Sequence, residues 1–396
     1  MTNIEIRFTV SDWLVSFGEA VNAIFDQSIE VALLYTFSRR PLKLSAPASY
    51  GDQASLIIRP HRIELRVNDV LCDEEWPCGE LATPLAPIET DSYTIREIEP
   101  ERPAELPDVL RHGITTSELR LPGVNIGDCI PFSDPSEKRY HLFYLYDRHH
   151  HGSKWGLGAH QWAHVSTTDL VTWDEHPMAI AVTEPWEGSI CTGSVVRTGD
   201  LYFAWYAVRM SDGSPARMTS ATSRDNLHYT KSGSYFTLPS AYEPSSARDP
   251  KVVELDGVFH MFVTTTRLES GHGCLAHLTS DTADFAAPTD CGAILEWDSG
   301  DQPECPDWFK LGDYYYLIYS IGGAARYLYS REPFSGFIRP SDDHIPCGRV
   351  PKAAFLGERC IFTGFVTEHG YADDVIFAEA TQNEDGTLRF TALSVG

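Results

Sequence analysis

Positive charge is scarce in this chain of 396 residues, which carries 31 Lys and Arg against 56 Asp and Glu, a formal net charge of −25. Nucleic acids and anionic membrane surfaces are bound through clustered Lys and Arg, so this balance argues against both as partners. A neutral substrate suits such a surface better, although a solvated acidic exterior explains most of the excess. The charge therefore points away from two partner classes and leaves small uncharged ligands open.

Long apolar runs and closely spaced cysteine pairs are missing as well. No uncharged stretch approaches the ~20 residues that a membrane span needs, and the first residues, MTNIEIR, lack the basic and apolar regions of a signal peptide. The nine cysteines include no CxxC pair of the kind that binds zinc or serves as a redox centre. We therefore expect a cytoplasmic protein with reduced cysteines, without a metal or other cofactor, and of undetermined oligomeric state.

Aromatic residues are abundant, with 9 Trp, 18 Tyr and 19 Phe. Aromatic side chains favour strands, and their apolar faces also stack on sugar rings. Residues 55–76 alternate with the period of strands around a turn at Asn68-Asp69, and residues 4–15 and 28–37 are also strand-like. Residues 15–25 are consistent with a short helix. We assign residues 1–105 to a small N-terminal β-sandwich-like domain, ending in a Pro- and acid-rich linker or surface strap from about residue 87.

A repeated pattern begins near Val124. Aromatic-rich strands start at residues 140, 201, 258, 314 and 360, and the last four follow short turns at 199–200, 256–257, 312–313 and 357–358. The spacing, roughly 45 to 60 residues, is close to that of β-propeller blades. No long segment has the 3.6-residue period of a helix. Residues 106–396 are therefore predicted to form an all-β, five-bladed β-propeller.

The strand that opens each blade of a propeller lines the central channel, and three of the five openers begin with an acid. These acids are Asp128, Asp249 and Glu304. Bringing them together costs folding energy, because like charges repel in a partly dry site. A shared task explains that cost, since glycoside cleavage needs one ionised carboxylate and one protonated carboxyl group. The three acids are therefore the predicted catalytic residues.

Several ordered motifs carry a family resemblance over roughly residues 124–390. They are RDP at 248–250, ECPD at 304–307, YHLFY at 140–144, WAHVS at 162–166, DLVTW at 169–173, TGSV at 192–195 and EDGTL at 384–388. This set resembles glycoside hydrolase family 32, which contains invertases, levanases and inulinases. The resemblance implies a fructofuranosidase that retains configuration, with Asp128 as nucleophile, Glu304 as general acid/base and Asp249 as transition-state stabiliser. Arg248 would help to hold the acids and the sugar.

Five further residues are assigned to substrate binding. Asn125 stands near the nucleophile in place of the family's usual amide, and Thr192 belongs to the second-blade motif. Trp155, Trp162 and His164 either shape the sugar site or fill the blade core. The expected substrate is an oligosaccharide or a small glycoside.

Other conspicuous residues have competing interpretations. The run His149 to His151 fits a metal site, a polar pocket rim or a solvated loop, and consecutive residues do not point together. Cys129 and Cys305 adjoin catalytic candidates but lack a paired base, so they are interpreted as small buried residues. Asp134 and Asp307 are interpreted as turn residues.

The sequence departs from the family pattern around the nucleophile. The family's Trp-Asn before and Pro-Asn-Gly after this acid are replaced here by the context IGDCI at 126–130, and Leu145 replaces a Gln. The sandwich precedes the propeller instead of following it. Two alternatives remain: an inverting arabinofuranosidase or xylosidase of family 43, whose carboxyl groups are ~6.5–9.5 Å apart against ~5–5.5 Å in a retaining pair, and a non-catalytic sugar-binding propeller.

Overall fold

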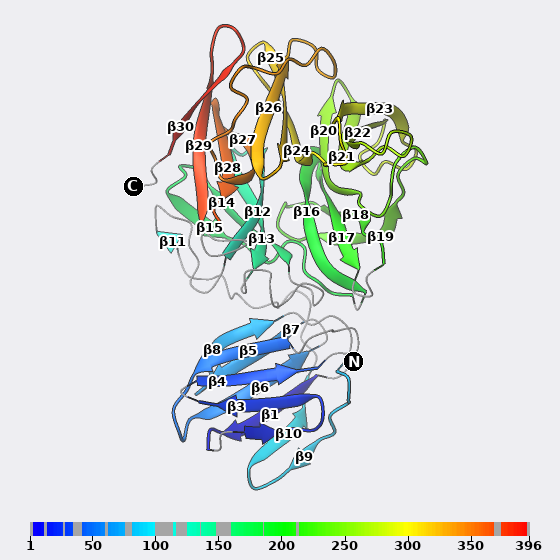
Figure 1. The fold of residues 1–396 in the computed structure, drawn as a ribbon. Helices are drawn as coiled ribbons and strands as arrows, with labels where there is room; N and C mark the ends of the chain where they lie inside the picture. Colours follow the sequence, from blue (N-terminus) through cyan, green and yellow to red (C-terminus); the bar gives the residue numbers. More distant parts are fainter. Residues whose placement is uncertain are drawn as a thin grey trace.

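The computed structural model of the protein describes residues 3–11, 14–26, 28–34, 42–59, 62–75, 81–99, 114–115, 125–134, 136–147, 160–184, 186–210, 214–367 and 374–393. Every regular element in these ranges is a β-strand. None of the described segments forms a helix that could cross a bilayer. The ribbon separates into a smaller N-terminal body and a larger C-terminal one (Figure 1).

The N-terminal body is a β-sandwich, as the sequence predicts. One sheet has the strand order β8-β7-β6-β1-β10-β9 and the other β2-β3-β4-β5. Their inner faces share one hydrophobic core, in which Ile6, Val31 and Leu56 are fully buried. The strands are β1 (Ile4–Thr9), β2 (Leu14–Ser16), β3 (Val21–Phe25), β4 (Ser28–Leu33), β5 (Leu42–Pro47), β6 (Gln53–Arg59), β7 (Arg62–Val67), β8 (Val70–Glu75), β9 (Ile88–Glu89) and β10 (Tyr93–Glu97).

Details of this domain correct the sequence interpretation. The short helix considered for residues 15–25 is wrong: Val21 and Ala23 point into the core while Ile24 is exposed, which is the period of a strand. Part of the proposed strap is also sheet, because β10 pairs with β1. The turn at Asn68-Asp69 is confirmed, with φ angles of 51° and 63°. The predicted domain boundary at 105/106 lies outside the described residues.

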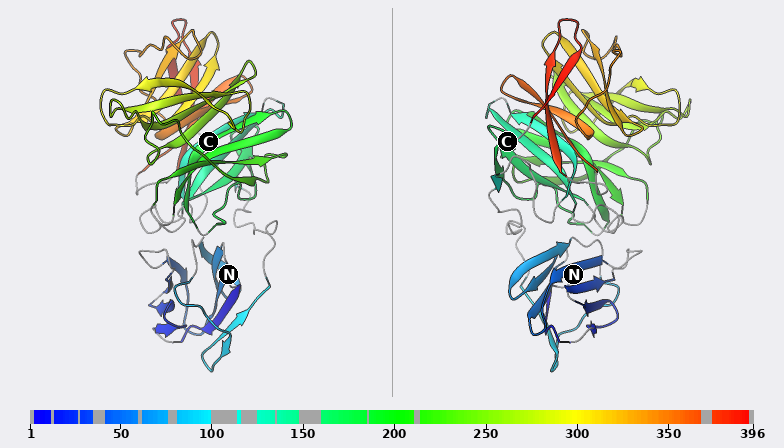
Figure 2. Two further views of the ribbon diagram at one scale, coloured as in Figure 1. Left: turned by 90° about the vertical axis from the view of Figure 1, so that its right-hand side faces the viewer. Right: turned by 60° about the vertical axis from the view of Figure 1, so that its left-hand side comes forward.

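The C-terminal body is a five-bladed β-propeller, which confirms the predicted fold class. The innermost strands β12, β16, β20, β24 and β27 pack against one another in sequence order, and β27 returns to β12 to close the ring. The short strand β11 (Ile114–Thr115) joins the outer edge of the first blade by pairing with β15. Successive blades follow the colour gradient of the ribbon (Figures 1 and 2).

The blades contain three or four main strands each. They are β12 (Asn125–Asp134), β13 (Arg139–Asp147), β14 (Gln161–Thr167) and β15 (Thr172–Glu175); β16 (Glu187–Thr198), β17 (Leu201–Met210), β18 (Arg217–Ser223) and β19 (Thr230–Phe236); β20 (Arg248–Leu255), β21 (Val258–Thr266), β22 (Gly273–Ser280) and β23 (Thr289–Glu296); β24 (Glu304–Leu311), β25 (Tyr314–Ile321) and β26 (Ala324–Ser330); β27 (Arg349–Leu356), β28 (Arg359–Phe365), β29 (Val375–Gln382) and β30 (Leu388–Ala392).

The aromatic-rich segments are the second strands of the blades. Each of the four turns predicted from sequence joins a first strand to a second strand, and at Asp256-Gly257 both φ angles are positive, 52° and 82°. These second strands are buried on both faces because each blade is covered by its neighbours. Tyr140 and Tyr144, for example, pack with Phe377 of the last blade in one core cluster. The aromatic content therefore fills the contacts between blades.

Every inner strand has a β-bulge at the same height in the ring. Two residues of the inner strand face one residue of the second strand in each blade, and these pairs are Gly127-Asp128, Cys191-Thr192, Asp249-Pro250, Cys305-Pro306 and Val350-Pro351. The backbone is left-handed at Asp249, Cys305 and Val350, with φ of 56°, 50° and 36°. Bulges re-aim the side chains around them, and here they turn the strand openings toward one cavity.

Candidate active site

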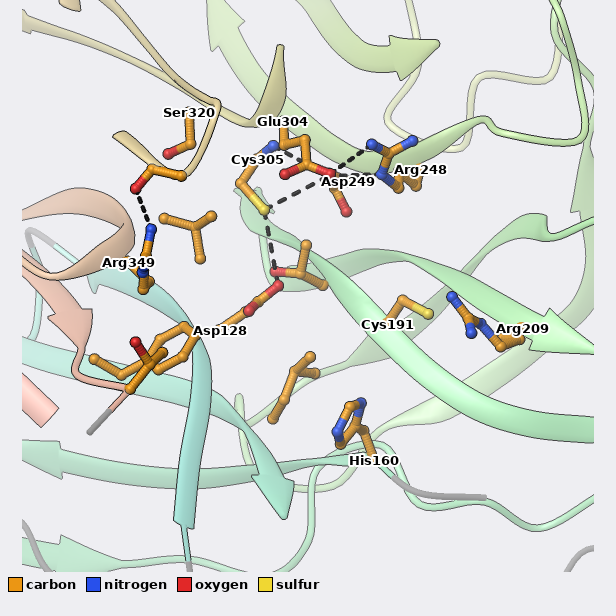
Figure 3. A pocket seen from close by; sticks show the side chains of 16 residues that line it. Asp128, His160, Cys191, Arg209, Arg248, Asp249, Glu304, Cys305, Ser320 and Arg349 are labelled. Atoms are coloured by element: carbon orange, nitrogen blue, oxygen red, sulfur yellow. Dashed lines mark hydrogen bonds and ion pairs between the residues drawn. The ribbon is translucent and has the colours of Figure 1, made fainter. Parts of the chain in front are cut away.

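A cavity of about 650 Å³ opens where the inner strands bulge. Residues from the bulges of all five blades line it, so the closed ring of the propeller determines its position. The three predicted catalytic acids are among them (Figure 3). The lining residues are Asp128, Leu145, His160, Cys191, Thr192, Arg209, Arg248, Asp249, Glu304, Cys305, Ser320, Gly323, Arg349, Val350, Phe365 and Thr367.

The acids are joined through two intervening residues. Arg248 Nη2 donates to Glu304 Oε1 at 2.7 Å, and Arg248 Nε lies 3.6 Å from Asp249 Oδ2. The backbone N–H of Cys305 donates to Asp249 Oδ2 at 3.0 Å. The Cys305 thiol lies 3.5 Å from Asp249 Oδ2 and 3.7 Å from Asp128 Oδ2 (Figure 3). Asp128, Asp249 and Glu304 therefore belong to one connected polar network.

Arg248 is held rigidly at the centre of this network. Its Nη1 donates to Gln302 Oε1 at 2.5 Å and to the carbonyl of Ser246 at 3.0 Å. Burial disfavours its charged form, but the charges of Asp249 and Glu304 outweigh burial and raise the pKa of Arg248 above its ordinary value. A fixed cation between two carboxylates offsets the repulsion that drives such acids apart.

Cys305 does more than the space-filling role expected from sequence. Burial, followed by the nearby charges of Asp249 and Asp128, raises the pKa of its thiol well above the ordinary value. The sulfur therefore keeps its proton, which it can donate to either carboxylate. Sequence inspection missed this contact because Cys305 and Asp128 are far apart along the chain and meet only when the ring closes.

The two acids in contact with Arg248 differ in exposure. Asp249 is buried, with 6% of its side chain exposed, whereas 48% of the Glu304 side chain is exposed. Asp249 is buried and its carboxylate has three contacts, which suits a fixed binding or stabilising role. An accessible carboxyl group suits exchange of a proton with substrate and water.

The predicted binding residues separate into three groups. Arg248 and Thr192 line the cavity, and the Thr192 hydroxyl is buried with no hydrogen-bond partner among the described residues. Trp162 and His164 are fully buried inside the first blade, and Trp162 reaches the cavity wall only through its 2.9 Å hydrogen bond to the carbonyl of Cys191. Trp162 and His164 therefore fill the blade core, which was the alternative to a place in the sugar site.

The side chains of the remaining candidates lie outside the described residues. The backbone of Asn125 begins β12 opposite Asp147, but its side chain lies outside the described residues. Trp155 and the run His149 to His151 also lie outside them.

Three basic residues of the cavity were not predicted: His160, Arg209 and Arg349. Arg349 occupies the same bulge position as Arg248 and Glu304, immediately before the left-handed residue and its proline. Its Nη1 donates to the carbonyl of Gly323. Aligning RVP at 349–351 with RDP and ECP would have identified Arg349 from sequence. Nothing comparable marks His160 or Arg209.

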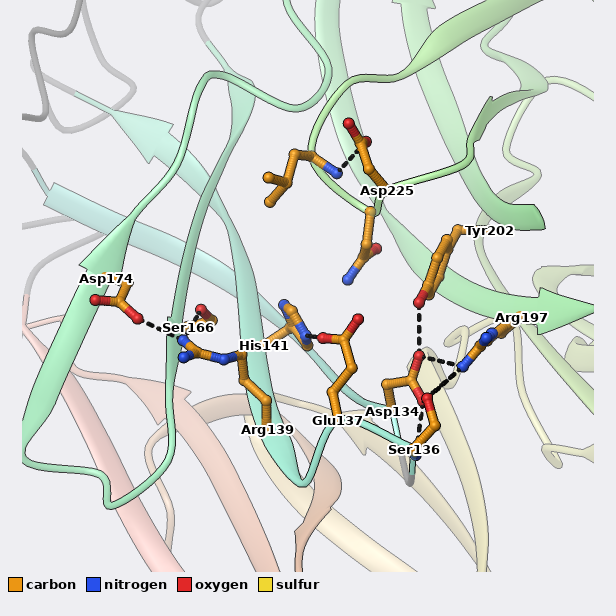
Figure 4. Close-up of polar contacts among 12 residues, drawn as sticks. Asp134, Ser136, Glu137, Arg139, His141, Ser166, Asp174, Arg197, Tyr202 and Asp225 are labelled. Carbon is orange, nitrogen blue, oxygen red and sulfur yellow. Dashed lines mark hydrogen bonds and ion pairs between the residues drawn. The ribbon is translucent and has the colours of Figure 1, made fainter. Parts of the chain in front are cut away.

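Asp307 is not a turn residue, which corrects the sequence interpretation. Asp134 is one, because its carbonyl and carboxylate accept the backbone N–H groups of Glu137 and Ser136, and it has a second role. Asp134 is buried at the end of β12, where it accepts hydrogen bonds from Arg197 Nη1 and Tyr202 of the second blade (Figure 4). Asp307 is fully buried in β24, 2.5 Å from Lys251 Nζ of the third blade, and it accepts a hydrogen bond from the backbone of Ala353 in the fifth. Both acids tie neighbouring blades together.

Removing Asp307 should destabilise the propeller strongly. Asp307→Ala leaves the Lys251 ammonium buried without its counter-ion, a change that costs about 3–5 kcal/mol in comparable pairs. Urea unfolding should detect this loss, and Asp313→Ala, at an exposed turn of the same blade, is the control expected to change little. The double variant Lys251→Met with Asp307→Leu should recover much of the stability; equal losses in the single and double variants would contradict the pairing.

The propeller segment of this chain is similar in sequence to known proteins. The family model described as Glycosyl hydrolases family 32 N-terminal domain matches residues 135–341. Asp249 and Glu304 lie inside that match, and Asp128 precedes it. The chain is 29% identical to the sucrose-6-phosphate hydrolase of Escherichia coli over 215 residues and 32% identical to that of Bacillus subtilis (strain 168) over 192. These matches cover 50% and 46% of this chain, but only 43% and 39% of the relatives.

Solved structures share the fold at low identity. Fructan 1-exohydrolase IIa from Cichorium intybus, solved in complex with 1-kestose, has a TM-score of 0.58 at 18% identity, over 70% of this chain and 60% of that one. RS223-Beta-xylosidase has a TM-score of 0.54 at 15% identity, over 68% of this chain and 96% of that one. Both similarities support the propeller, and neither distinguishes between the two kinds of substrate.

Proposed function

Because the chain belongs to glycosyl hydrolase family 32, we propose that it is a glycoside hydrolase that cleaves fructofuranosides. The observation that carries the proposal is the single network in which Arg248 and Cys305 connect Asp128, Asp249 and Glu304 at the wall of one cavity. Glycoside hydrolysis needs two carboxyl groups with different roles at one sugar carbon. The names of the curated relatives, sucrose-6-phosphate hydrolases, favour a fructose-containing substrate.

We assign the roles by position and exposure. Asp128, at the bulge of β12, attacks the anomeric carbon. Glu304, the more accessible acid, protonates the leaving oxygen and then removes a proton from the incoming water. Asp249, held by the Cys305 backbone and by Arg248, accepts hydrogen bonds from the sugar hydroxyls as charge develops on the ring. Arg248 contacts both Asp249 and Glu304 and so holds the two carboxylates in fixed positions near each other.

Hydrolysis should proceed with net retention of configuration. The Cys305 thiol contacts Asp128 and Asp249, and Arg248 contacts Asp249 and Glu304, so the three acids share one network. This arrangement supports direct attack by Asp128 over attack by a water held between two distant carboxyl groups. Proton NMR of the first-formed anomer is the measurement, with product recorded before mutarotation. An inverted first product would make Asp128 a general base and favour the family 43 alternative.

Substrate assays test the function itself. Sucrose, sucrose 6-phosphate and 1-kestose are compared with an aryl arabinofuranoside and an aryl xyloside, at equal enzyme concentration. The proposal requires turnover of at least one fructoside above both aryl pentosides. Binding of these sugars without turnover would instead identify a sugar-binding propeller. Arg209 and Arg349 in the cavity wall make the phosphorylated fructoside the first to be tried.

We also propose that the protein works in the cytoplasm. The described cysteines, Cys72, Cys129, Cys191, Cys274, Cys291, Cys305, Cys347 and Cys360, are all free thiols. Unpaired cysteines in such number suit a reducing compartment. Fractionation of cells that produce the protein, with antibody detection, tests the location.

A further inference from the structure

Three histidines converge in the first blade, outside the cavity. His141 lies on β13, His164 on β14, and His176 directly follows β15. One ring nitrogen from each lies within 4.8 Å of the other two. The sequence indicated no such site, because the three residues are separated by a dozen or more positions and have no recognisable metal-binding spacing. The packing of three adjacent strands brings them together.

The contacts around these rings leave one nitrogen unsatisfied. His141 Nε2 lies 3.3 Å from the carboxylate of Glu137, so this nitrogen carries the proton and donates it (Figure 4). His141 Nδ1, 3.0 Å from His164 Nε2, must then be the acceptor of that contact. His164 is consequently left with a bare Nδ1, which is buried and has no partner among the described residues. The third ring is oriented by the Ser166 hydroxyl, which lies 2.7 Å from His176 Nε2.

Burial of these rings disfavours a charged imidazolium: His141 and His164 are buried and His176 is half-buried. Arg139 is the cation facing the group, and Asp174 neutralises it through a 2.5 Å ion pair (Figure 4). Uncharged imidazoles offer their lone pairs, which is the form that a metal binds.

We propose that His141, His164 and His176 form a binding site for a divalent transition metal of the zinc class. Imidazole nitrogens are suitable ligands for such ions. Zinc binds them at about 2.0–2.1 Å, so three nitrogens already within 4.8 Å need only small side-chain movements to surround it. Glu137, hydrogen-bonded to the far nitrogen of His141, has the place of the carboxylate that commonly orients a ligating histidine.

The third blade provides an internal comparison. His260 and His277 occupy the same strand positions there, on β21 and β22, with a ring contact of 2.9 Å. The third side of that pair is covered by Phe334, whose ring stacks on His260 at 3.9 Å. A pair of histidines is therefore compatible with simple core packing. The third imidazole, His176, is what makes the first blade different.

The site has a structural role in this proposal. The backbone N–H of His176 donates to the carbonyl of His164 at 3.0 Å, where the chain leaves β15 at the outer edge of the blade. A metal on all three rings would clamp this edge to β13 and β14. It would raise stability by binding the folded state alone. The proposal does not depend on the catalytic function, since none of the three histidines lines the cavity.

The experiment uses the full chain, stripped with a chelator and titrated with Co²⁺ and then with Zn²⁺. We expect one tightly bound ion per chain, visible absorption bands of four-coordinate Co²⁺ that Zn²⁺ displaces, and a higher melting temperature with Zn²⁺. His176→Phe, which copies the third blade, should abolish tight binding, and His277→Gln should leave one ion per chain. Glu137→Gln, which keeps every ligand, should weaken binding by about 10–100-fold.

Two results would overturn the site. One is a stripped wild-type protein that folds normally and binds neither ion tightly. The other is tight binding that persists unchanged in His176→Phe, which would locate the ion elsewhere, for instance at surface histidines. Because Glu137→Gln does not alter the core, its effect on affinity remains measurable even if His176→Phe fails to fold.

Discussion

Asp128→Asn should reduce the hydrolysis of a fructoside substrate by about 10⁴- to 10⁶-fold, the range seen when a covalent nucleophile is removed. The amide keeps the size of the side chain and can still accept a hydrogen bond from the Cys305 thiol, so the cavity should remain intact. What it loses is the negative charge that attacks the anomeric carbon. The measurement is kcat/KM on the best substrate from the panel above.

Asp128 precedes the segment that the family model matches, so the role of Asp128 depends on this experiment more than the roles of Asp249 and Glu304 do. Asp200→Asn, at an exposed turn of the second blade, is the matched control and should keep full activity. Added azide should restore some turnover to Asp128→Ala by attacking the vacated face of the sugar, giving a glycosyl azide of inverted configuration. Activity of Asp128→Asn within tenfold of the wild type would remove Asp128 from the nucleophile role.

Glu304→Gln should lower the hydrolysis of sucrose-type substrates by about 10²–10⁴-fold, the usual contribution of a general acid. The loss should be much smaller for an activated aryl fructofuranoside, because a good leaving group departs without protonation. The amide oxygen can still accept the hydrogen bond of Arg248 that Glu304 Oε1 now accepts, so the geometry of the network is preserved. The measurement is the ratio of kcat/KM values for the two substrates in wild type and variant.

The pattern across substrates separates the acid role from a general disruption of the site. Gln302→Ala, which removes an uncharged partner of Arg248, is a suitable comparison, because it should affect both substrates by the same factor. If Glu304→Gln behaves in the same uniform way, Glu304 positions Arg248 and another group supplies the proton.

The sequence was sufficient to predict the strands and their grouping into blades. Alternating side chains, aromatic-rich second strands and turn residues such as Asp256-Gly257 are local signals, and each acts within a few residues. The repeat then implies a ring, because each blade must bury its aromatic faces against two neighbours. The three acids could be identified in the same way, since each opens a strand that a propeller directs toward its axis.

The tertiary structure decided what depends on contacts between distant segments. Cys305 reaches Asp128, Asp307 reaches Lys251, and His176 reaches His141 only when strands from different parts of the chain are packed side by side. The hydrogen bonds and pKa shifts of these groups depend on burial and on partners that no local pattern encodes. Asp307 illustrates the difference: beside a proline it resembles a turn residue, and only the closed ring buries it as an ion-pair partner.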